Sequence, residues 1–479
     1  MSRATTLKAL AASLAACGVL SACSVPAITE APGKAAPAIP SAWPAGQGQQ
    51  AVQAAWWQAF GDPLLDRWVG LAAERNNDVL AAMSRVDEAR ANLELAGSAT
   101  LPQASATAPL SAGRSLGARG LTHTRSIQPG LQASWEIDLW NRLGQLRNAA
   151  DLRLQATQAD RDAVSLAVAA TTAQAYITLR SLQAQLTAAQ STVRSREDAV
   201  RLADDQVRVG YISQLQQSQA LAELQSVQQA VEQLSLALER QSLSLLQLAG
   251  GTGDEAAQAL MRDTLGQGGF DAVALPAVPS AGMPSALLER RPDIARAQLQ
   301  LAASDSNLAA QRAAFLPQVT LSASVGSLLI NALDYHPATV WSVGGSILAP
   351  LFSGGRLQGQ FDAASAQRDQ AAYAYRGAVI KAFADVEGAL LSAQRLQAQW
   401  EHASQREAVL ERTLGFAKDR YEAGYASYLE ELDAQRNLYA VQQDVIKLRE
   451  AQLQNAVTLY QALGGGWQKP AALQKAQVS

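Results

Sequence analysis

The sequence has few of the residues on which catalysis and metal binding depend. Its 479 residues contain only three histidines, and these stand far apart, at His123, His336 and His402. Protein metal sites need several ligands close together, so we predict no metal site. The sequence also lacks a P-loop, a GxSxG turn and an HExxH motif. No catalytic constellation is therefore apparent.

Charge of one sign and long apolar runs are also scarce. The net charge is −3, and basic residues are interspersed with acidic ones instead of forming a stripe. Nucleic acid is therefore not an expected partner. After the N-terminal signal there is no apolar run of about 18 residues, which excludes a membrane-spanning helix.

The N-terminus has the pattern of a lipoprotein export signal. Residues 1–22 begin with basic residues and continue as a run of small and apolar ones. The segment Leu20-Ser21-Ala22-Cys23 resembles the lipobox of bacterial lipoproteins, in which the cysteine receives the lipid. Cys17 also fits this pattern, but Cys23 gives the longer apolar region. Ser24 follows instead of the aspartate that retains such lipoproteins in the inner membrane, so the resemblance implies sorting to the outer membrane.

A long helical hairpin organises the first half of the chain. Good helix formers run from Arg142 to Gly251, with a turn at Val209-Gly210-Tyr211. The seam of the first run has alternating spacings of three and four residues, at Leu179, Leu182, Leu186, Ala189, Val193, Arg196, Val200, Ala203 and Val207. This period of 3.5 predicts supercoiled helices that pack side by side. Upstream, Asp62-Pro63 predicts the N-cap of a short helix, and a further helix is expected over Asp78–Ala96.

Between these helices the pattern changes to the two-residue period of strands. From Ile127 to Leu139 apolar residues alternate with polar or small ones. Gln103–Ser111 predicts a weaker partner strand, and we interpret Ala112–Arg125, with its glycines, as the loop between the two. A second pair of alternating stretches lies at 319–325 and 341–347.

The chain contains an internal duplication. Leu316-Pro317-Gln318 repeats Leu101-Pro102-Gln103 at an offset of 215 residues, and Gly424-Tyr425 repeats Gly210-Tyr211 at an offset of 214. Each half is thus expected to be helix, strand, strand, long helix, turn and long helix. The predicted divisions are a signal peptide (1–22), an extended arm (23–55), a first repeat (56–251), a linker (252–283), a second repeat (284–466) and a C-terminal tail (467–479).

Four strands in one chain are too few to close a sheet within a membrane. An open sheet edge is not tolerated in lipid, and the smallest spanning barrels have about eight strands. Copies of the chain must therefore pool their strands, and the twelve strands of three copies leave an interior wide enough for solutes. The alternative is a water-soluble β-sandwich that carries a coiled-coil arm.

These features resemble the TolC-type outer-membrane factors, and more narrowly the NodT-like lipoproteins of RND tripartite efflux systems. The most specific likeness is Leu287–Ala297, which contains Glu289-Arg290-Arg291-Pro292-Asp293, and segments 57–63 and 421–435 also match. The resemblance implies a mainly α-helical fold with a membrane β-barrel portion. In that fold a homotrimer forms a twelve-stranded barrel that continues into a twelve-helix periplasmic tunnel. It also implies no enzymatic activity and no cofactor.

By the same resemblance the protein is a passive exit duct for small toxic compounds, either drugs or metal ions. A periplasmic adaptor and an inner-membrane RND pump would deliver them. The duct would be lipid-anchored in the outer membrane, span it and extend into the periplasm. Two alternatives stay open, a structural or adhesive coiled-coil lipoprotein of the outer membrane and a type I secretion duct.

The two helical turns are the predicted functional sites. The resemblance places the hairpin tips, with Gly210, Tyr211, Gly424 and Tyr425, where the tunnel meets its adaptor. Glycine permits a sharp turn, and tyrosine offers partly apolar surface to a partner. The candidate periplasmic gate consists of Asp204, Asp205, Arg208, Asp419, Arg420 and Tyr421. Opposite charges on neighbouring helices would latch the tunnel shut, although each is also interpretable as a solvated side chain. Asp419 is the candidate for a selectivity ring.

Overall fold

The protein consists of two compact units in a computed structural model. The structure describes residues 25–30, 32–35, 43, 52–117, 120–267, 269–279, 281–282 and 284–469, so Cys17 and Cys23 lie outside the described residues. Unit 1 comprises residues 1–37, 85–158 and 296–377, and unit 2 comprises residues 38–84, 159–295 and 378–479. Within the described ranges, no helix is both long enough and apolar enough to cross a membrane.

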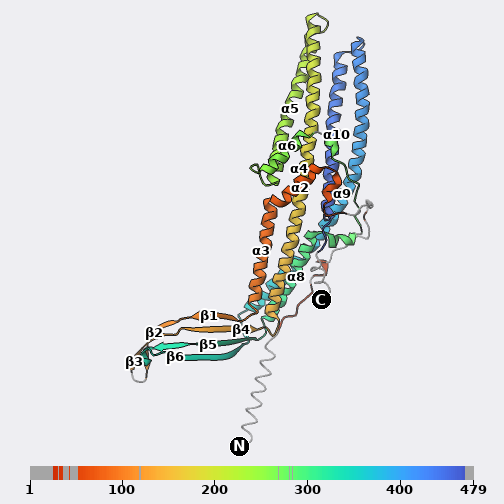
Figure 1. Ribbon diagram of the computed structural model, residues 1–479. Coiled ribbons are helices and arrows are strands. Elements are labelled where there is room, and N and C mark those ends of the chain that lie inside the picture. Colours follow the sequence, from red (N-terminus) through yellow and green to blue (C-terminus); the bar gives the residue numbers. More distant parts are fainter. Residues whose placement is uncertain are drawn as a thin grey trace. The chain divides into compact units, whose positions relative to one another are not determined.

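Long helices make up most of both repeats (Figure 1). α4 (Arg142–Arg208) and α9 (Arg356–Glu422) have 67 residues each, and α5 (Gln214–Leu248) and α10 (Tyr428–Ala462) have 35 residues each. The starts of both pairs are 214 residues apart, which confirms the predicted duplication. The 22-residue helices α3 (Asn77–Ser98) and α8 (Pro292–Ala313) precede the strands of the two repeats.

The predicted helix start at Asp62 is confirmed. Asp62 is the N-cap of α2 (Pro63–Arg75), and its carboxylate accepts a hydrogen bond from the backbone N–H of Leu64 over 2.9 Å. The same carboxylate accepts a second hydrogen bond, over 2.5 Å, from the hydroxyl of Tyr176 on α4. Burial, together with this hydrogen bond, raises the pKa of Tyr176. One buried carboxylate thus joins the start of α2 to the middle of α4.

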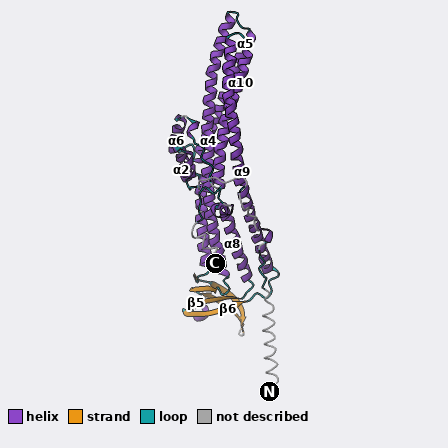
Figure 2. Ribbon diagram, turned by 90° about the vertical axis from the view of Figure 1, so that its right-hand side faces the viewer, coloured by secondary structure: helices purple, strands orange, loops and turns teal. Residues whose placement is uncertain are grey.

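The strands form one antiparallel sheet in unit 1 (Figure 2). They are β1 (Gln103–Thr107), β2 (Leu110–Gly117), β3 (Gly120–Ile127), β4 (Gly130–Ile137), β5 (Gln318–Ile330) and β6 (Ala338–Leu348). β1 pairs with β4 and β2 pairs with β3, while β4 and β3 both pair with β5, and β6 also pairs with β5. The chain therefore crosses the sheet four times, as predicted.

The prediction of a loop over Ala112–Arg125 is wrong, because the described residues of this segment belong to β2 and β3. Their register runs from Leu110 opposite Ile127 to Gly117 opposite Gly120. The residues are mostly small or polar, so they lack the apolar alternation by which the other strands were recognised. The breaks before β2 and β4 fall at Pro109 and Pro129, where proline cannot donate to the ladder of hydrogen bonds.

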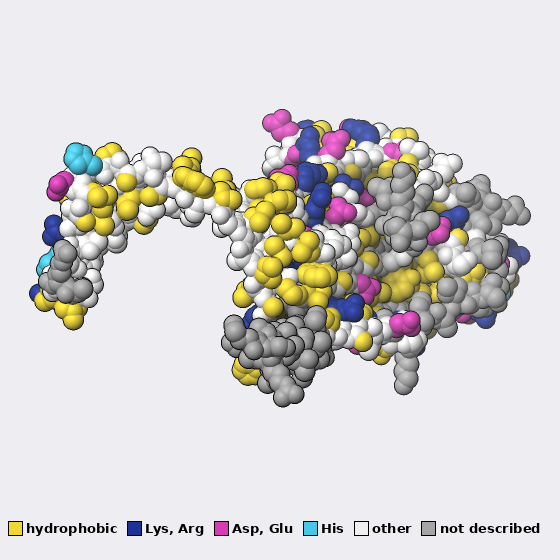
Figure 3. Space-filling view, turned by 90° about the horizontal axis from the view of Figure 1, so that it is seen from below, with side chains coloured by type: hydrophobic (Ala, Val, Ile, Leu, Met, Phe, Trp, Pro, Cys, Tyr) yellow, Lys and Arg dark blue, Asp and Glu magenta, His cyan; other side chains and the backbone are white. Residues whose placement is uncertain are grey.

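Large apolar side chains of the sheet are exposed (Figure 3). They are Leu110, Leu116, Leu121, Leu131, Leu321, Val325, Trp341, Val343 and Ile347. An antiparallel sheet in water normally buries its apolar face against a core, and a larger exposed apolar surface marks a membrane or partner contact. Pattern and exposure together therefore favour strands that face lipid.

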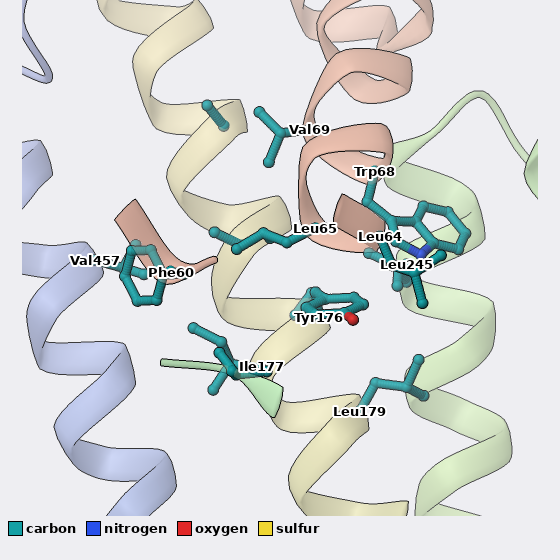
Figure 4. Close-up of a cluster of buried hydrophobic side chains, with 14 of the residues drawn as sticks. Phe60, Leu64, Leu65, Trp68, Val69, Tyr176, Ile177, Leu179, Leu245 and Val457 are labelled. Carbon is teal, nitrogen blue, oxygen red and sulfur yellow. The ribbon is translucent and has the colours of Figure 1, made fainter. Parts of the chain in front are cut away.

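A large apolar core lies in unit 2 (Figure 4). It brings together side chains from the 3-10 helix η2 (Trp56–Phe60), α2, α4, α5 and α10, among them Phe60, Leu65, Trp68, Tyr176, Ile177, Leu179, Leu245 and Val457. A further helix, α6 (Glu255–Gly266), adds Leu260 and Met261, and its Thr264 hydroxyl accepts a hydrogen bond from the Trp68 ring N–H over 2.9 Å. Residues 252–283 thus contain a helix that packs into this core.

Candidate functional site

Both long hairpins turn on a glycine in the left-handed conformation. Gly210 has a φ of +77° and Gly424 has a φ of +76°. The next backbone amides, of Tyr211 and Tyr425, each donate to the carbonyl five residues earlier over 2.8 Å, which closes the helix end. A Cβ at either glycine would point into open space, so the backbone conformation alone requires glycine. The side chains of Tyr211 and Tyr425 are 75% and 80% exposed.

The predicted gate charges of α4 make contacts within their own hairpin. Arg208 pairs with Asp205 one turn earlier, and both side chains are largely exposed. Asp204 accepts a hydrogen bond from the side chain of Gln217 on α5 over 2.8 Å. These contacts support the helix ends on either side of the Gly210 turn.

The predicted gate charges of α9 also make their contacts within their own hairpin. Arg420 lies 3.7 Å from Glu430 across the turn to α10, Lys418 lies 3.9 Å from Glu422, and Asp419 is exposed. Among the residues that the structure describes, no ion pair joins the predicted charges of one hairpin to those of the other. Exposed pairs of this kind contribute little to stability, typically about 0.2–1 kcal/mol.

Tyr421 does contact the other hairpin. Its hydroxyl donates to the side-chain oxygen of Gln206 on α4 over 3.3 Å, and its ring centroid lies 5.7 Å from that of Tyr428 on α10. Burial and the neighbouring Glu431 raise the pKa of Tyr421. Tyr421 and Gln206 therefore form a direct polar link between α9 and α4 close to the tips.

A second link between the hairpins was not predicted from the sequence. Arg436 on α10 pairs with Glu223 on α5, and hydrogen bonds from Arg436 lower the pKa of Glu223 although burial opposes this. The same two helices, together with α4, also contribute Ala220, Leu432 and Ala203 to a small apolar cluster. The 3.5-residue period predicts that helices pack together, but it does not identify which helices meet.

The signature segment holds a buried arginine. Arg291, 7% exposed, lies between α7 (Leu287–Arg290) and α8. Its guanidinium lies 2.7 Å from a carboxylate oxygen of Asp293 and 3.2 Å from one of Asp385 on α9, and it donates to the carbonyl of Ala462 at the end of α10 over 3.1 Å. Burial alone would raise the pKa of Asp293, but the hydrogen bonds from Arg291 keep it below its ordinary value.

The described residues offer no cluster of three or more His, Cys, Asp or Glu side chains that would hold a metal ion. Unit 2 contains a partly polar cavity of about 440 Å³ between α4, α9 and α10. It is lined by serine, threonine, glutamine, glutamate and arginine side chains as well as by aliphatic ones.

Comparison with known proteins places this arrangement in one group. The model of the family described as outer membrane efflux protein matches residues 68–251 and 283–465. The pyoverdine export outer membrane protein OpmQ of Pseudomonas aeruginosa is 35% identical over 468 residues, which cover 95% of this chain and 96% of that protein. The cation efflux system protein CusC of Escherichia coli O157:H7 is 32% identical, over 87% of this chain and 89% of its own. The solved structure of the outer-membrane channel OprN superposes with a TM-score of 0.84 and 25% identity, over 93% of this chain and all of that one.

The fold and its two repeats define a TolC-like channel subunit of the outer membrane that reaches into the periplasm. Its two family matches coincide closely with the two repeats found in the sequence. The chain belongs to the outer membrane efflux protein family, which is a family of transport channels. The protein is thus an efflux duct component, and the structural or adhesive lipoprotein is disfavoured.

Proposed function

We propose that three copies of this chain close a twelve-stranded barrel and a twelve-helix tunnel, which serves as the passive exit duct of a tripartite efflux pump. An inner-membrane RND pump and a periplasmic adaptor would supply the cargo. The observation that carries this proposal is the open sheet. Within the described chain, β6 pairs on one side only, with β5, and β1 and β2 pair on one side only, with β4 and β3.

Unpaired strand edges carry free N–H and C=O groups that lipid does not satisfy. Pairing β6 of one copy with β1 and β2 of the next would satisfy both edges, and three copies with four chain passes each give twelve strands. The exposed apolar side chains of the strands would then face the bilayer. Acylation of Cys23 would add a lipid anchor beside the barrel.

The cargo of the duct is proposed to be a class of small compounds. The names of the two relatives refer to pyoverdine and to cations, so the fold serves small organic and inorganic cargo alike. We expect the pump to select among them, because the duct provides a path and no cofactor or catalytic group is needed for passage.

Deleting the gene is expected to increase sensitivity to at least one toxic compound that the partner pump exports, because the duct is the exit for its cargo. The measurement is growth inhibition across a broad panel of drugs and metal ions with the pump and adaptor expressed, and with the wild-type gene restored as the control. The purified protein should have the mass of three chains in detergent and conduct ions in planar bilayers. Unchanged sensitivity together with a non-conducting single subunit would contradict the proposal.

The tips are proposed to form the gate and the adaptor contact. Tyr211 and Tyr425 are the exposed surface for the adaptor, next to Gly210 and Gly424. Tyr421, hydrogen-bonded to Gln206, would hold α9 against α4 in the closed state. The charges Asp204, Asp205, Arg208 and Arg420 would stabilise the hairpin ends, and the exposed Asp419 is the proposed selectivity residue.

Replacing Tyr421 by phenylalanine is expected to raise the open probability of the channel in planar bilayers. The substitution removes the hydroxyl that bonds Gln206 and keeps the ring that packs on Tyr428. A neutral hydrogen bond contributes about 0.5–1.5 kcal/mol, so the three links of a trimer would shift the balance substantially. Tyr425→Phe, which removes an exposed hydroxyl from the same tip, is the matched control and should behave as wild type. An open probability of the Tyr421 variant equal to that of wild type would exclude this link from the gate.

A further inference from the structure

One face of the β2–β3 hairpin continues the apolar face of the sheet. Ile127 on β3 lies opposite Leu329 on β5, and residues directly opposite one another in an antiparallel pair point to the same face. Leu329 follows Val325 by four residues, so it shares a face with this exposed apolar side chain. The odd-numbered residues of β3 and their partners on β2 therefore lie on the apolar face of the sheet.

Basic side chains take the place of apolar ones on this face of the hairpin. Arg114 on β2 lies opposite His123 on β3, and Arg125 lies opposite Ala112. All three basic side chains are exposed. The other face of β2 and β3 carries only glycine, serine and threonine. In a chain of net charge −3, residues 110–127 contain three arginines, one histidine and no acidic residue.

The register places these basic residues just beyond the apolar part of the face. On β5 this part extends from Val319 to Leu329, which matches the about 9–11 residues of a tilted membrane-spanning strand. Arg125 lies two residues beyond Ile127, the partner of Leu329, and thus about 7 Å further along the strand. The long helices of both repeats join the opposite end of the sheet, so the basic end is the one that faces out of the cell. Figure 3 shows basic and histidine side chains at this end.

The backbone that carries the basic residues is fixed where β5 ends. The side chain of Asn331 accepts a hydrogen bond from the backbone N–H of Arg125 over 2.9 Å and donates one to the carbonyl of His123 over 2.8 Å. Within the described chain, the side chains of Arg114 and Arg125 form no ion pair. The hairpin thus presents ordered cations without a carboxylate of their own chain.

We propose that Arg114, His123 and Arg125 bind the phosphate groups of an anionic lipid in the outer leaflet of the membrane. Arginine forms paired hydrogen bonds with phosphate, and the imidazole N–H is a further donor. Basic clusters beside membrane-spanning segments attract anionic lipid headgroups. This inference rests on the proposed barrel, because the face contacts lipid only when the sheet spans the membrane.

The continuity of the face favours a lipid over a soluble anion. A bound phosphate at Arg125 would lie directly above the apolar side chains of Ile127 and Leu329, where the acyl chains of the same molecule would pack. A soluble anion has no group that uses this apolar surface. Each copy of the chain would contribute one such site to the rim of the barrel.

The test uses the full-length trimer in an uncharged maltoside detergent, with lipid A that carries two phosphates as the probe. Native mass spectrometry measures the bound lipid, and monophosphoryl lipid A is the matched control ligand. Wild-type protein should bind the diphosphoryl form more tightly, and an equal concentration of inorganic phosphate should not displace it. Arg125→Gln should weaken binding about fivefold, and Arg114→Gln combined with it should weaken binding further, because each arginine contributes separately.

A variant with unchanged net charge is the matched control protein. Thr124→Arg combined with Arg125→Thr moves the cation to the other face of β3, where Gly113 lies opposite and leaves room for it. If the face decides, this variant should bind the lipid as weakly as Arg125→Gln does. Binding equal to wild type would show that the net charge of the hairpin alone attracts the lipid, which overturns the proposal.

The trimer mass and ion conductance of each variant separate this site from the barrel itself. A conducting wild-type trimer that binds both forms of lipid A equally refutes the lipid site alone, whereas a wild-type protein without trimer or conductance refutes the proposed function. Binding like wild type by the trimeric double variant also overturns the site, as does a loss of trimer with unchanged lipid affinity, which would assign the arginines to subunit contacts. If the double variant does not assemble, Arg125→Gln and the charge-conserving variant decide.

Discussion

Replacing Arg291 by alanine is expected to destabilise each subunit by about 3–5 kcal/mol, the usual effect of removing one partner of a buried ion pair. Arg291 contacts two carboxylates, Asp293 and Asp385, and the backbone carbonyl of Ala462. The alanine variant removes the guanidinium donor and leaves its three acceptors in place without it. Because these groups lie at the start of α8, on α9 and at the end of α10, the loss would loosen three helix segments at once.

The measurement for this variant is the denaturant midpoint of the helical circular dichroism signal, at a fixed protein concentration because trimer formation contributes to stability. Arg290→Ala is the matched control, since the neighbouring side chain is exposed, and it should change the midpoint little. A midpoint of Arg291→Ala equal to that of Arg290→Ala would show that the network contributes no net stability.

The stability difference between wild type and Arg291→Ala is expected to depend on pH, and the pKa of Asp293 gives the direction. Asp293 has a folded-state pKa below its ordinary value of 3.8, so its interaction stabilises the wild-type protein above that value. This stabilisation is lost as the pH falls through the lower, folded-state pKa. The stability difference between wild type and Arg291→Ala should therefore narrow in strongly acidic buffer and stay constant around neutral pH.

The elements with strong periodicity could be predicted from the sequence. The helical hairpins, their glycine turns and the N-cap at Asp62 follow from local chemistry, because each depends on residues that are close in sequence. The four passes of the sheet were predicted from the two-residue alternation of three stretches and a weaker fourth, and the duplication was predicted from motifs that recur about 214 residues apart. The family signature around Arg291 was recognised, but only the structure shows that its guanidinium ties α8 to α9 and α10.

The features that were missed depend on contacts between distant segments. The β2–β3 hairpin has mostly small and polar residues, and its few large apolar residues do not alternate regularly. Glu223 and Arg436 are ordinary surface residues of their own helices, and their pairing depends on which helices meet. Arg196 was placed in the packing seam by its spacing, but its burial depends on helices that are distant in the sequence.

Replacing Gly464 by alanine is expected to lower stability by about 2–5 kcal/mol, through two additive causes. Gly464 follows α10 with a φ of +88°, a conformation that costs an L-residue about 1–2 kcal/mol. A Cβ there would also lie 2.8 Å from the carbonyl carbon of Arg290 and closer still to its oxygen. Backbone atoms cannot rotate away as a side chain can, so overpacking adds a further cost of about 1–3 kcal/mol.

Gly210→Ala separates these two causes. Gly210 has a similar φ of +77°, but a Cβ there would meet open space. Its substitution should therefore show the conformational cost alone, and the difference between the two denaturant midpoints measures the steric contact with Arg290. Because the added Cβ would clash with the backbone of Arg290, the residue before Arg291, the alanine variant should also displace the Arg291 network. Combining it with Arg291→Ala should thus be less than additive, whereas full additivity would show that the turn and the network act independently.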